Sequence, residues 1–239
     1  MTEQRRAELA DNLARVQDRI ASACAAAGRS AEEVTLIVVT KFFPASDVAH
    51  LLDLGVRDIG ESRDQEAGAK VDELRDLTGD TDELVVHFVG QLQRNKAASV
   101  SRYADVVHSV DRERLATALE RGAARHDRIL DVLVQVDLDP DPDPDRGGVG
   151  PDDVSAVAAA IVGLGHVRLR GVMSVAPPKQ DPAAAFARLA EVSARLRGEH
   201  RDASWISAGM SGDLESAVAH GATHLRVGTA ILGSRPSHR

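Results

Sequence analysis

Residues 204–233 read SWISAGMSGDLESAVAHGATHLRVGTAILG, and this stretch contains one complete unit of the fold. Two short runs rich in apolar residues fit buried strands, Ser204–Ala208 and His224–Gly228. Between them Leu214 and Val218 stand four residues apart, the spacing of one face of a helix. A strand, a helix and a second strand within so short a stretch predict two parallel strands joined by a helical crossover.

The same alternation continues towards the N-terminus. The apolar runs are continuous more often than alternating, which is typical of parallel strands covered on both faces. Eight strands alternating with helices fit a closed (β/α)₈ TIM barrel or an open doubly wound sheet, and the eight units with an extra leading helix favour the α/β barrel. The six further strands that we expect are Val34–Thr40, Asp58–Gly60, Leu84–Gly90, Val106–Val110, Ile129–Leu138 and Val167–Val175.

A helix over about residues 7–27 is predicted before the first strand. Gly28 stands where a glycine would end it. Too few residues follow the eighth strand for an eighth crossover helix, so we expect the leading helix to fill that place in the outer ring. One domain is expected over residues 1–239, with the barrel over about 30–233. The apolar face of the leading helix is formed by Leu9, Leu13, Val16, Ile20 and Cys24.

Several polar residues are placed to cap helices. Ser30 and Glu33 have the spacing of a capping box that opens a short turn. Asp181, followed by a proline, predicts the start of another helix. Asp111 and Ser211 are the caps expected for the helices after the fourth and seventh strands.

The composition argues against several classes of protein. Acidic residues outnumber basic ones, 37 to 29, and the formal net charge of −8 disfavours nucleic-acid binding because phosphates would be repelled. Aromatic residues make up only 3%, so the core must be built mainly from aliphatic side chains, as barrel interiors are. Cys24 is the only cysteine, which leaves no disulfide and no thiolate metal cage.

Membrane and export signals are not found in the sequence. No apolar run approaches the roughly 18 residues of a membrane span. The opening residues MTEQRRAELADNLARV lack the apolar segment of a secretion signal. We therefore expect a cytoplasmic protein.

Lys41 is the first candidate for chemistry. It directly follows the first predicted strand, in residues 36–44, LIVVTKFFP. Such a lysine either extends its ammonium to the rim or lies inside the barrel mouth, where active sites of barrels are built. Burial would lower its pKa from about 10.4 and supply the neutral amine that attacks aldehydes.

The ends of the seventh and eighth strands suggest a phosphate site. They read SAGMSGD (207–213) and RVGTAILG (226–233), with glycines, hydroxyls and backbone N–H groups. The loops after these two strands are where barrels commonly bind phosphate. A lysine on one side and a phosphate cradle on the other fit a ligand with both an aldehyde and a phosphate, and pyridoxal 5′-phosphate (PLP) is such a ligand.

Six runs of sequence resemble the PLP homeostasis protein family. The resemblance runs in order from about Arg29 to Gly233, nearly the whole chain. It implies a single fold-type III barrel, similar to the barrel domain of alanine racemase. The runs are VTLIVVTKFFP (34–44), DIGESRDQEA (58–67), HFVGQLQRNK (87–96), SVDRERLA (109–116), RGVMSVAP (170–177) and residues 207–233.

The resemblance assigns roles to individual residues. It implies that Lys41 holds PLP as a Schiff base and that Arg226 points into the barrel, towards the pyridine nitrogen or the phosphate, with the nitrogen favoured. An arginine at that nitrogen keeps it unprotonated and weakens PLP as an electron sink. The residues implied at the phosphate end are Ser207, Gly209, Met210, Gly228 and Thr229.

Three further positions carry weaker expectations. Ser62 stands where the family usually has asparagine, so we expect it to reach PLP only through water. His87 is equally compatible with a cofactor contact and with a satisfied core histidine. The loop Asp139–Pro151 is expected to be either a lid or a solvated acidic loop, and its Arg146 either attracts the phosphate or offsets the aspartates around it.

The resemblance implies that the protein is a non-enzymatic PLP carrier, which buffers and supplies the cofactor. The alternatives are a racemase or decarboxylase type of PLP enzyme and a Schiff-base aldolase without PLP. Racemisation needs a second base, usually a tyrosine from a second domain, whereas Tyr103 is expected on an outer helix. A His87/His108 metal pair lacks a third ligand, so no metal is expected. We expect a monomer whose partners are PLP and apo PLP-dependent enzymes.

Overall fold

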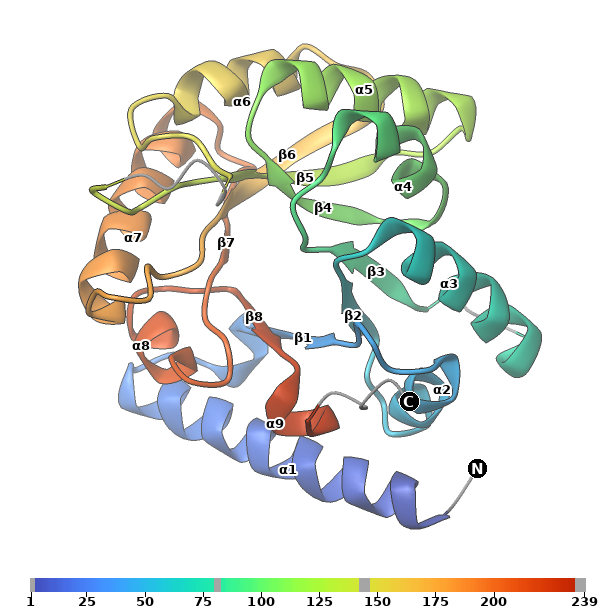
Figure 1. The fold of residues 1–239 in the computed structure, drawn as a ribbon. Helices are drawn as coiled ribbons and strands as arrows, with labels where there is room; N and C mark the ends of the chain where they lie inside the picture. Colours follow the sequence, from blue (N-terminus) through green and yellow to red (C-terminus); the bar gives the residue numbers. More distant parts are fainter. Residues whose placement is uncertain (1–2, 80–82, 142–146, 235–239) are drawn as a thin grey trace.

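The computed structural model describes residues 3–79, 83–141 and 147–234, and it is a closed barrel of eight parallel strands in chain order (Figure 1). The predicted TIM-barrel class is confirmed. The strands are β1 (Thr35–Val39), β2 (Asp58–Glu61), β3 (Val85–Phe88), β4 (Val106–Val110), β5 (Leu130–Gln135), β6 (Val167–Met173), β7 (Trp205–Ser207) and β8 (His224–Val227).

Helices form a ring around the barrel (Figure 1). Each predicted crossover contains one. The helices are α1 (Glu3–Ala26), α2 (Ala45–Asp53), α3 (Asp64–Thr78), α4 (Ala97–Tyr103), α5 (Glu113–Arg125), α6 (Val154–Val162), α7 (Pro182–Glu199), α8 (Leu214–Ala219) and α9 (Thr229–Leu232), and the 3₁₀ turns are η1 (Ala31–Glu33) and η2 (Arg94–Lys96). Within the described part of the chain, no helix is both long and apolar enough to cross a membrane.

Strand β1 closes the barrel because it pairs with β2 on one side and with β8 on the other. The β1–β8 register runs from Thr35 opposite His224 to Val38 opposite Val227. An open sheet would leave two strands with a free edge, and this pairing excludes it. Closure also brings the segments that follow β1 and β8 to the same side of the barrel mouth.

Helix α1 packs against α2, α8 and α9, as predicted for the gap in the ring. Its buried stripe includes the apolar face expected from the sequence. Polar contacts also anchor it: Arg5 bonds Asp47 of α2 and the carbonyl of Leu232, and Asn12 Nδ2 donates to the Ile231 carbonyl at 2.8 Å. One expectation was wrong, because a single turn of helix, α9, does follow β8.

The structure confirms two of the predicted caps and corrects two. Ser30 forms the capping box of η1, and Asp181 accepts from the backbone N–H of Ala183 at the start of α7. The N-caps of α5 and α8 are Arg112 and Asp213, not Asp111 and Ser211. After β7 the helix starts late because the Asp213 carboxylate accepts from the Met210 N–H at 2.6 Å, which closes a turn over Ser211.

Removing a buried side chain of α1 tests whether this helix is part of the folded barrel. Leu9 is fully buried. Leu9→Ala should lower the free energy of unfolding by about 2–5 kcal/mol, because it leaves a cavity between α1 and the barrel wall. Urea denaturation measures the change, and Asp11→Ala on the exposed face is the control. Equal stability of the two variants would mean that α1 is not packed in solution.

Candidate functional site

A cavity of about 300 Å³ opens at the barrel mouth between the ends of β1 and β8. It brings together five of the residues predicted for the site, although they come from the two ends of the sequence. The turn after β7 supplies the opposite wall with Ser211 and Gly212. The predicted residues that line the cavity are Lys41, Met210, Arg226, Gly228 and Thr229.

Hydrogen bonds hold the backbone on both sides of Lys41. The Lys70 ammonium donates to the carbonyl oxygen of Thr40 at 2.8 Å, and the N–H of Phe42 donates to the carboxylate of Glu66. Lys70 and Glu66 stand four residues apart on α3, so one face of this helix forms hydrogen bonds with the backbone before and after Lys41. This support fixes where the Lys41 side chain begins.

Lys70 also forms a buried ion pair with Glu61. Glu61, fully buried at the end of β2, accepts from the Lys70 ammonium and from the Thr40 hydroxyl, both at 2.6 Å. Burial raises the pKa of Glu61, and the Lys70 ammonium acts in the opposite direction. Sequence reasoning missed Lys70, Glu61 and Glu66; the signal was the Lys70/Glu66 spacing together with a glutamate at a predicted strand end.

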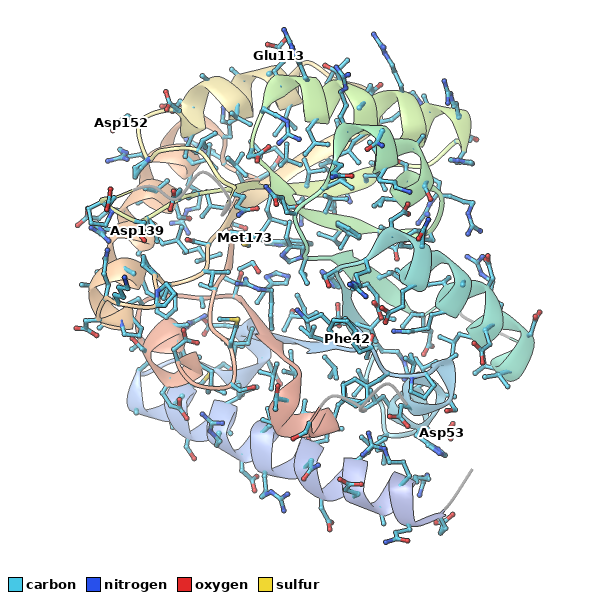
Figure 2. All side chains as sticks on the ribbon, in the orientation of Figure 1. Phe42, Asp53, Glu113, Asp139, Asp152 and Met173 are labelled. Carbon is cyan, nitrogen blue, oxygen red and sulfur yellow. The ribbon has the colours of Figure 1, made fainter. Side chains whose placement is uncertain are left out.

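Phe42, directly after Lys41, has a left-handed backbone conformation with φ 72°. Non-glycine residues rarely adopt it, and such strain is found preferentially at functional sites. The ring, labelled in Figure 2, lies at the barrel opening, where it lines the cavity, and the Arg63 guanidinium sits 5.1 Å from its centre. The chain therefore turns sharply as soon as it has presented Lys41.

Arg226 is a buried cation that faces this cavity. Its two terminal nitrogens donate to Ser207 Oγ at 2.6 Å and to the carbonyl oxygen of Ser174 at 2.8 Å. Burial lowers its pKa to about 10, the charge of Asp213 acts in the opposite direction, and no described carboxylate forms an ion pair with it. A buried cation without a carboxylate partner favours a ligand that accepts hydrogen bonds or carries negative charge.

A chain of hydrogen bonds continues from Arg226 through the barrel interior. Ser207 Oγ lies 2.9 Å from His108 Nδ1, His108 Nε2 lies 2.9 Å from His87 Nδ1, and His87 Nε2 lies 2.9 Å from a carboxylate oxygen of Asp58. Arginine can only donate, so Ser207 Oγ accepts from Arg226, and the tautomers of His108 and His87 set the direction of the links that follow. Two imidazole rings in the barrel interior thus link the buried Arg226 to Asp58.

Two residues predicted for the cofactor site, Ser207 and His87, belong instead to this chain of hydrogen bonds. Ser207 is fully buried and does not line the cavity, since its hydroxyl is used by Arg226 and His108. His87 is bonded at both ring nitrogens and also lies away from the cavity, which matches the core reading of this residue. Within the described residues, no group of three or more histidine, cysteine or acidic side chains could hold a metal ion.

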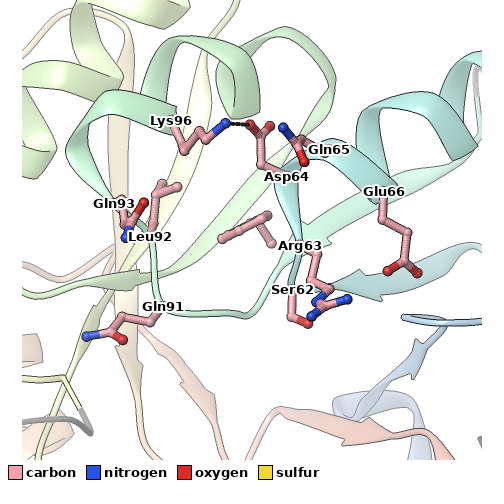
Figure 3. A pocket seen from close by; sticks show the side chains of 10 residues that line it. Ser62, Arg63, Asp64, Gln65, Glu66, Gln91, Leu92, Gln93 and Lys96 are labelled. Carbon is pink, nitrogen blue, oxygen red and sulfur yellow. Dashed lines mark ion pairs between the residues drawn. The ribbon is translucent and has the colours of Figure 1, made fainter.

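The other predicted residues lie elsewhere. Gly209 has φ +91°, and a Cβ on it would come 2.6 Å from the Cβ of Ala217, so it allows close packing against α8. Ser62 lines a separate cavity of about 570 Å³ between the segments after β2 and β3 (Figure 3), where Lys96 pairs with Asp64 at 3.7 Å. Arg146 lies outside the described residues, as does part of its loop.

Comparison with known proteins gives the family. Residues 7–236 match the family model "Alanine racemase, N-terminal domain". The chain is 45% identical to the pyridoxal phosphate homeostasis protein of Mycobacterium tuberculosis strain H37Rv, over 97% of this chain and 94% of that protein. The chain belongs to the pyridoxal phosphate homeostasis protein family. The protein of the same name from Escherichia coli K12 is 37% identical over 95% of this chain.

Solved structures agree with the family and the fold. PipY of Synechococcus elongatus, solved with PLP bound, is 35% identical, covers 94% of this chain and all of its own, and has a TM-score of 0.80. Alanine racemase from Corynebacterium glutamicum shares the fold, with a TM-score of 0.68 at 16% identity. This chain spans 60% of that racemase. The resemblance seen in the sequence is thereby confirmed.

The buried histidines predict how stability depends on pH. Burial lowers the pKa of His224 to about 3, with His87 contributing. An unfolded histidine has a pKa of about 6.5, so as the pH falls the unfolded chain binds this proton first. The folded state should lose about 1.4 kcal/mol per pH unit through this residue between about pH 6.5 and pH 3.

Urea denaturation at several pH values measures this slope. His224→Gln should make the fall in stability with pH shallower by about that amount per unit, whatever its effect at neutral pH. His126→Gln, on an exposed residue, is the control and should leave the slope as in the parent protein. An unchanged slope in the His224 variant would contradict its burial in the neutral form.

Proposed function

We propose that this protein binds PLP reversibly in the cavity between β1 and β8, with Lys41 as the point of covalent attachment, and that it buffers and supplies the cofactor. The observation that carries the proposal is that one cavity is lined by both Lys41 and the buried cation Arg226. PLP in the related PipY structure supports the same ligand.

The residues around the cavity fit the parts of PLP. Lys41 supplies an amine for the aldehyde, on a backbone held rigidly by α3. The unprotonated ring nitrogen of PLP accepts a hydrogen bond, and the Arg226 guanidinium can donate it. Thr229 and the backbone of Ser211 and Gly212 offer donors for the phosphate, and bonds of this charge-assisted kind are each worth about 1.5–3 kcal/mol.

A carrier role is favoured over a PLP enzyme by what the cavity provides. Bound PLP supplies an electrophilic carbon and an electron sink, and an arginine at its nitrogen weakens that sink. Tyr103 is buried in α4 with its hydroxyl 3.5 Å from Asp64, and it is not among the residues that line the cavity. Burial raises the pKa of Tyr103, so its hydroxyl stays protonated near neutral pH and the basic tyrosinate form is not available.

Replacing Lys41 tests the attachment. Lys41→Ala should abolish the yellow colour of protein mixed with PLP and the adduct trapped by borohydride, because no amine remains at the cavity. Absorption spectra and mass spectrometry of peptides measure the two effects, with Lys179→Ala as a control on an exposed lysine. A trapped adduct on another lysine in the parent protein would refute the assignment. A protein that stays colourless with PLP would favour an aldolase.

Two single variants separate the ends of the ligand. Thr229→Val should weaken PLP binding about tenfold while pyridoxal, which lacks the phosphate, is little affected. Ser207→Ala should weaken both ligands to a similar extent, because Ser207 acts by holding Arg226 at the ring end. Titrations followed by absorbance give the dissociation constants of PLP and pyridoxal for each variant, and each constant is compared with that of the parent protein. Equal loss of both ligands in the Thr229 variant would place the phosphate elsewhere.

Transfer of the cofactor tests the carrier role against an enzymatic one. Protein loaded with PLP should restore activity to an apo PLP-dependent enzyme, and the Lys41→Ala protein should not do so comparably. The second arm measures turnover of free amino acids of both hands. Steady racemisation or decarboxylation well above that of free PLP, and lost with Lys41, would overturn the carrier role in favour of an enzyme.

A further inference from the structure

A groove of about 440 Å³ runs along the outer wall of the barrel between α4 and α5, far in sequence from the Lys41 cavity. Its floor is made of small residues, because the two helices approach closely: a Cβ on Gly122 would come 2.6 Å from the hydroxyl of Ser101. Glu113, labelled on this wall in Figure 2, is the acidic residue among those that line it. Four arginines line the groove: Arg94, Arg114, Arg121 and Arg125.

Three of these arginines form one stripe on α5. Arg114, Arg121 and Arg125 are separated by seven and four residues, so they lie within roughly 40° of one another around the helix axis. The stripe is about 16 Å long at 1.5 Å per residue. Arg94, from η2, adds a fourth cation from the segment that follows β3. The charges thus lie along a line and do not converge on one point.

These arginines differ from most others on the surface. Arg19, Arg57, Arg102 and Arg168 each pair with a carboxylate within 4 Å. The four groove arginines are exposed, and none of them forms an ion pair or hydrogen bond with another described residue. The chain has a net charge of −8, so acidic side chains are plentiful, yet Glu113 is the one acidic residue that lines this groove, and it forms no ion pair with these arginines. Like charges spaced four residues apart also work against the helix.

From these observations we infer that the groove binds an acidic segment of a partner protein, with carboxylates spaced along about 16 Å. A single phosphate or carboxylate cannot reach all four arginines at that spacing. Nucleic acid fits less well, because the chain has a net charge of −8 and the residues lining the groove include no aromatic side chain on which a base could stack.

The location gives the groove a link to the barrel mouth. Arg94 follows directly on Gln93, which lines the larger mouth cavity of Figure 3, and α5 begins just after β4. A partner held along α5 would therefore have one end beside the mouth. The inference goes beyond the proposed function, since the groove makes no use of Lys41 or of the cofactor.

The test uses the full-length protein without PLP and a fluorescent helical peptide of about 15 residues, with glutamates at positions i, i+4, i+7 and i+11. Anisotropy titrations at about 0.01 M salt, where the Debye length is about 30 Å, should show binding that weakens strongly at about 0.15 M. The peptide with glutamines at the same positions should not bind. A single-stranded DNA of similar length is the third probe.

Charge reversal locates the binding. The double variant Arg121→Glu/Arg125→Glu should weaken the glutamate peptide about tenfold or more, through repulsion along the groove. The matched control is Arg197→Glu/Arg201→Glu, which reverses two exposed arginines at the end of α7, outside the groove, and should keep parent affinity. Arg121→Gln/Arg125→Gln should fall between them, and thermal unfolding checks that each variant is folded.

Several outcomes would overturn the inference. They are no binding of the glutamate peptide, equal binding of the glutamine peptide, or equal loss in the groove and control variants. Tighter binding of the DNA than of the peptide, lost on groove reversal, would assign the groove to nucleic acid instead. None of these results depends on PLP, so failure here is distinguishable from failure of the carrier role.

Discussion

Pairing of β1 with β8 is the constraint on which the candidate site depends. It sets Thr35 opposite His224 and Val38 opposite Val227, although these residues are almost 190 positions apart in the chain. Strands held in register must end at the same level, so the residues that follow them meet. Lys41 and Gly228 line one cavity for this reason, and a slip in register would separate the amine from the opposite wall.

Polar networks then fix the side chains that closure brings together. On one side, Lys70 and Glu66 of α3 hold the backbone around Lys41, and Glu61 of β2 pairs with Lys70. On the other, Arg226 begins a chain of hydrogen bonds that ends at Asp58, at the start of β2. A buried polar group is costly unless satisfied, so these networks hold their members in one arrangement. The cavity between them is therefore preorganised on both walls.

The outer wall of the barrel differs from its mouth in how its charged side chains are arranged. Arginines such as Arg102 and Arg168 pair with carboxylates there, whereas the four between α4 and α5 stand together and form no ion pair with a described residue. The mouth and the wall carry separate chemistry: one arranges a lysine and an arginine around a small cavity, and the other presents a line of charge. One barrel can hold both because its interior and its helical ring are formed by opposite faces of the same units.

Sequence alone predicted eight β/α units, favoured a closed barrel over an open sheet and gave α1 its place in the ring, because apolar runs and helical spacing repeat with the period of β/α units, whereas closure between β1 and β8 is seen only in the structure. The sequence also singled out Lys41, Arg226, Gly228 and Thr229, since strand ends in such a barrel face its mouth. Only the tertiary structure decided that Ser207 and His87 belong to a buried chain of hydrogen bonds and that Ser62 lines another cavity. Lys70 could not be assigned from the sequence either. Hydrogen-bond partners across a barrel depend on register and distance, which local patterns of residues do not encode.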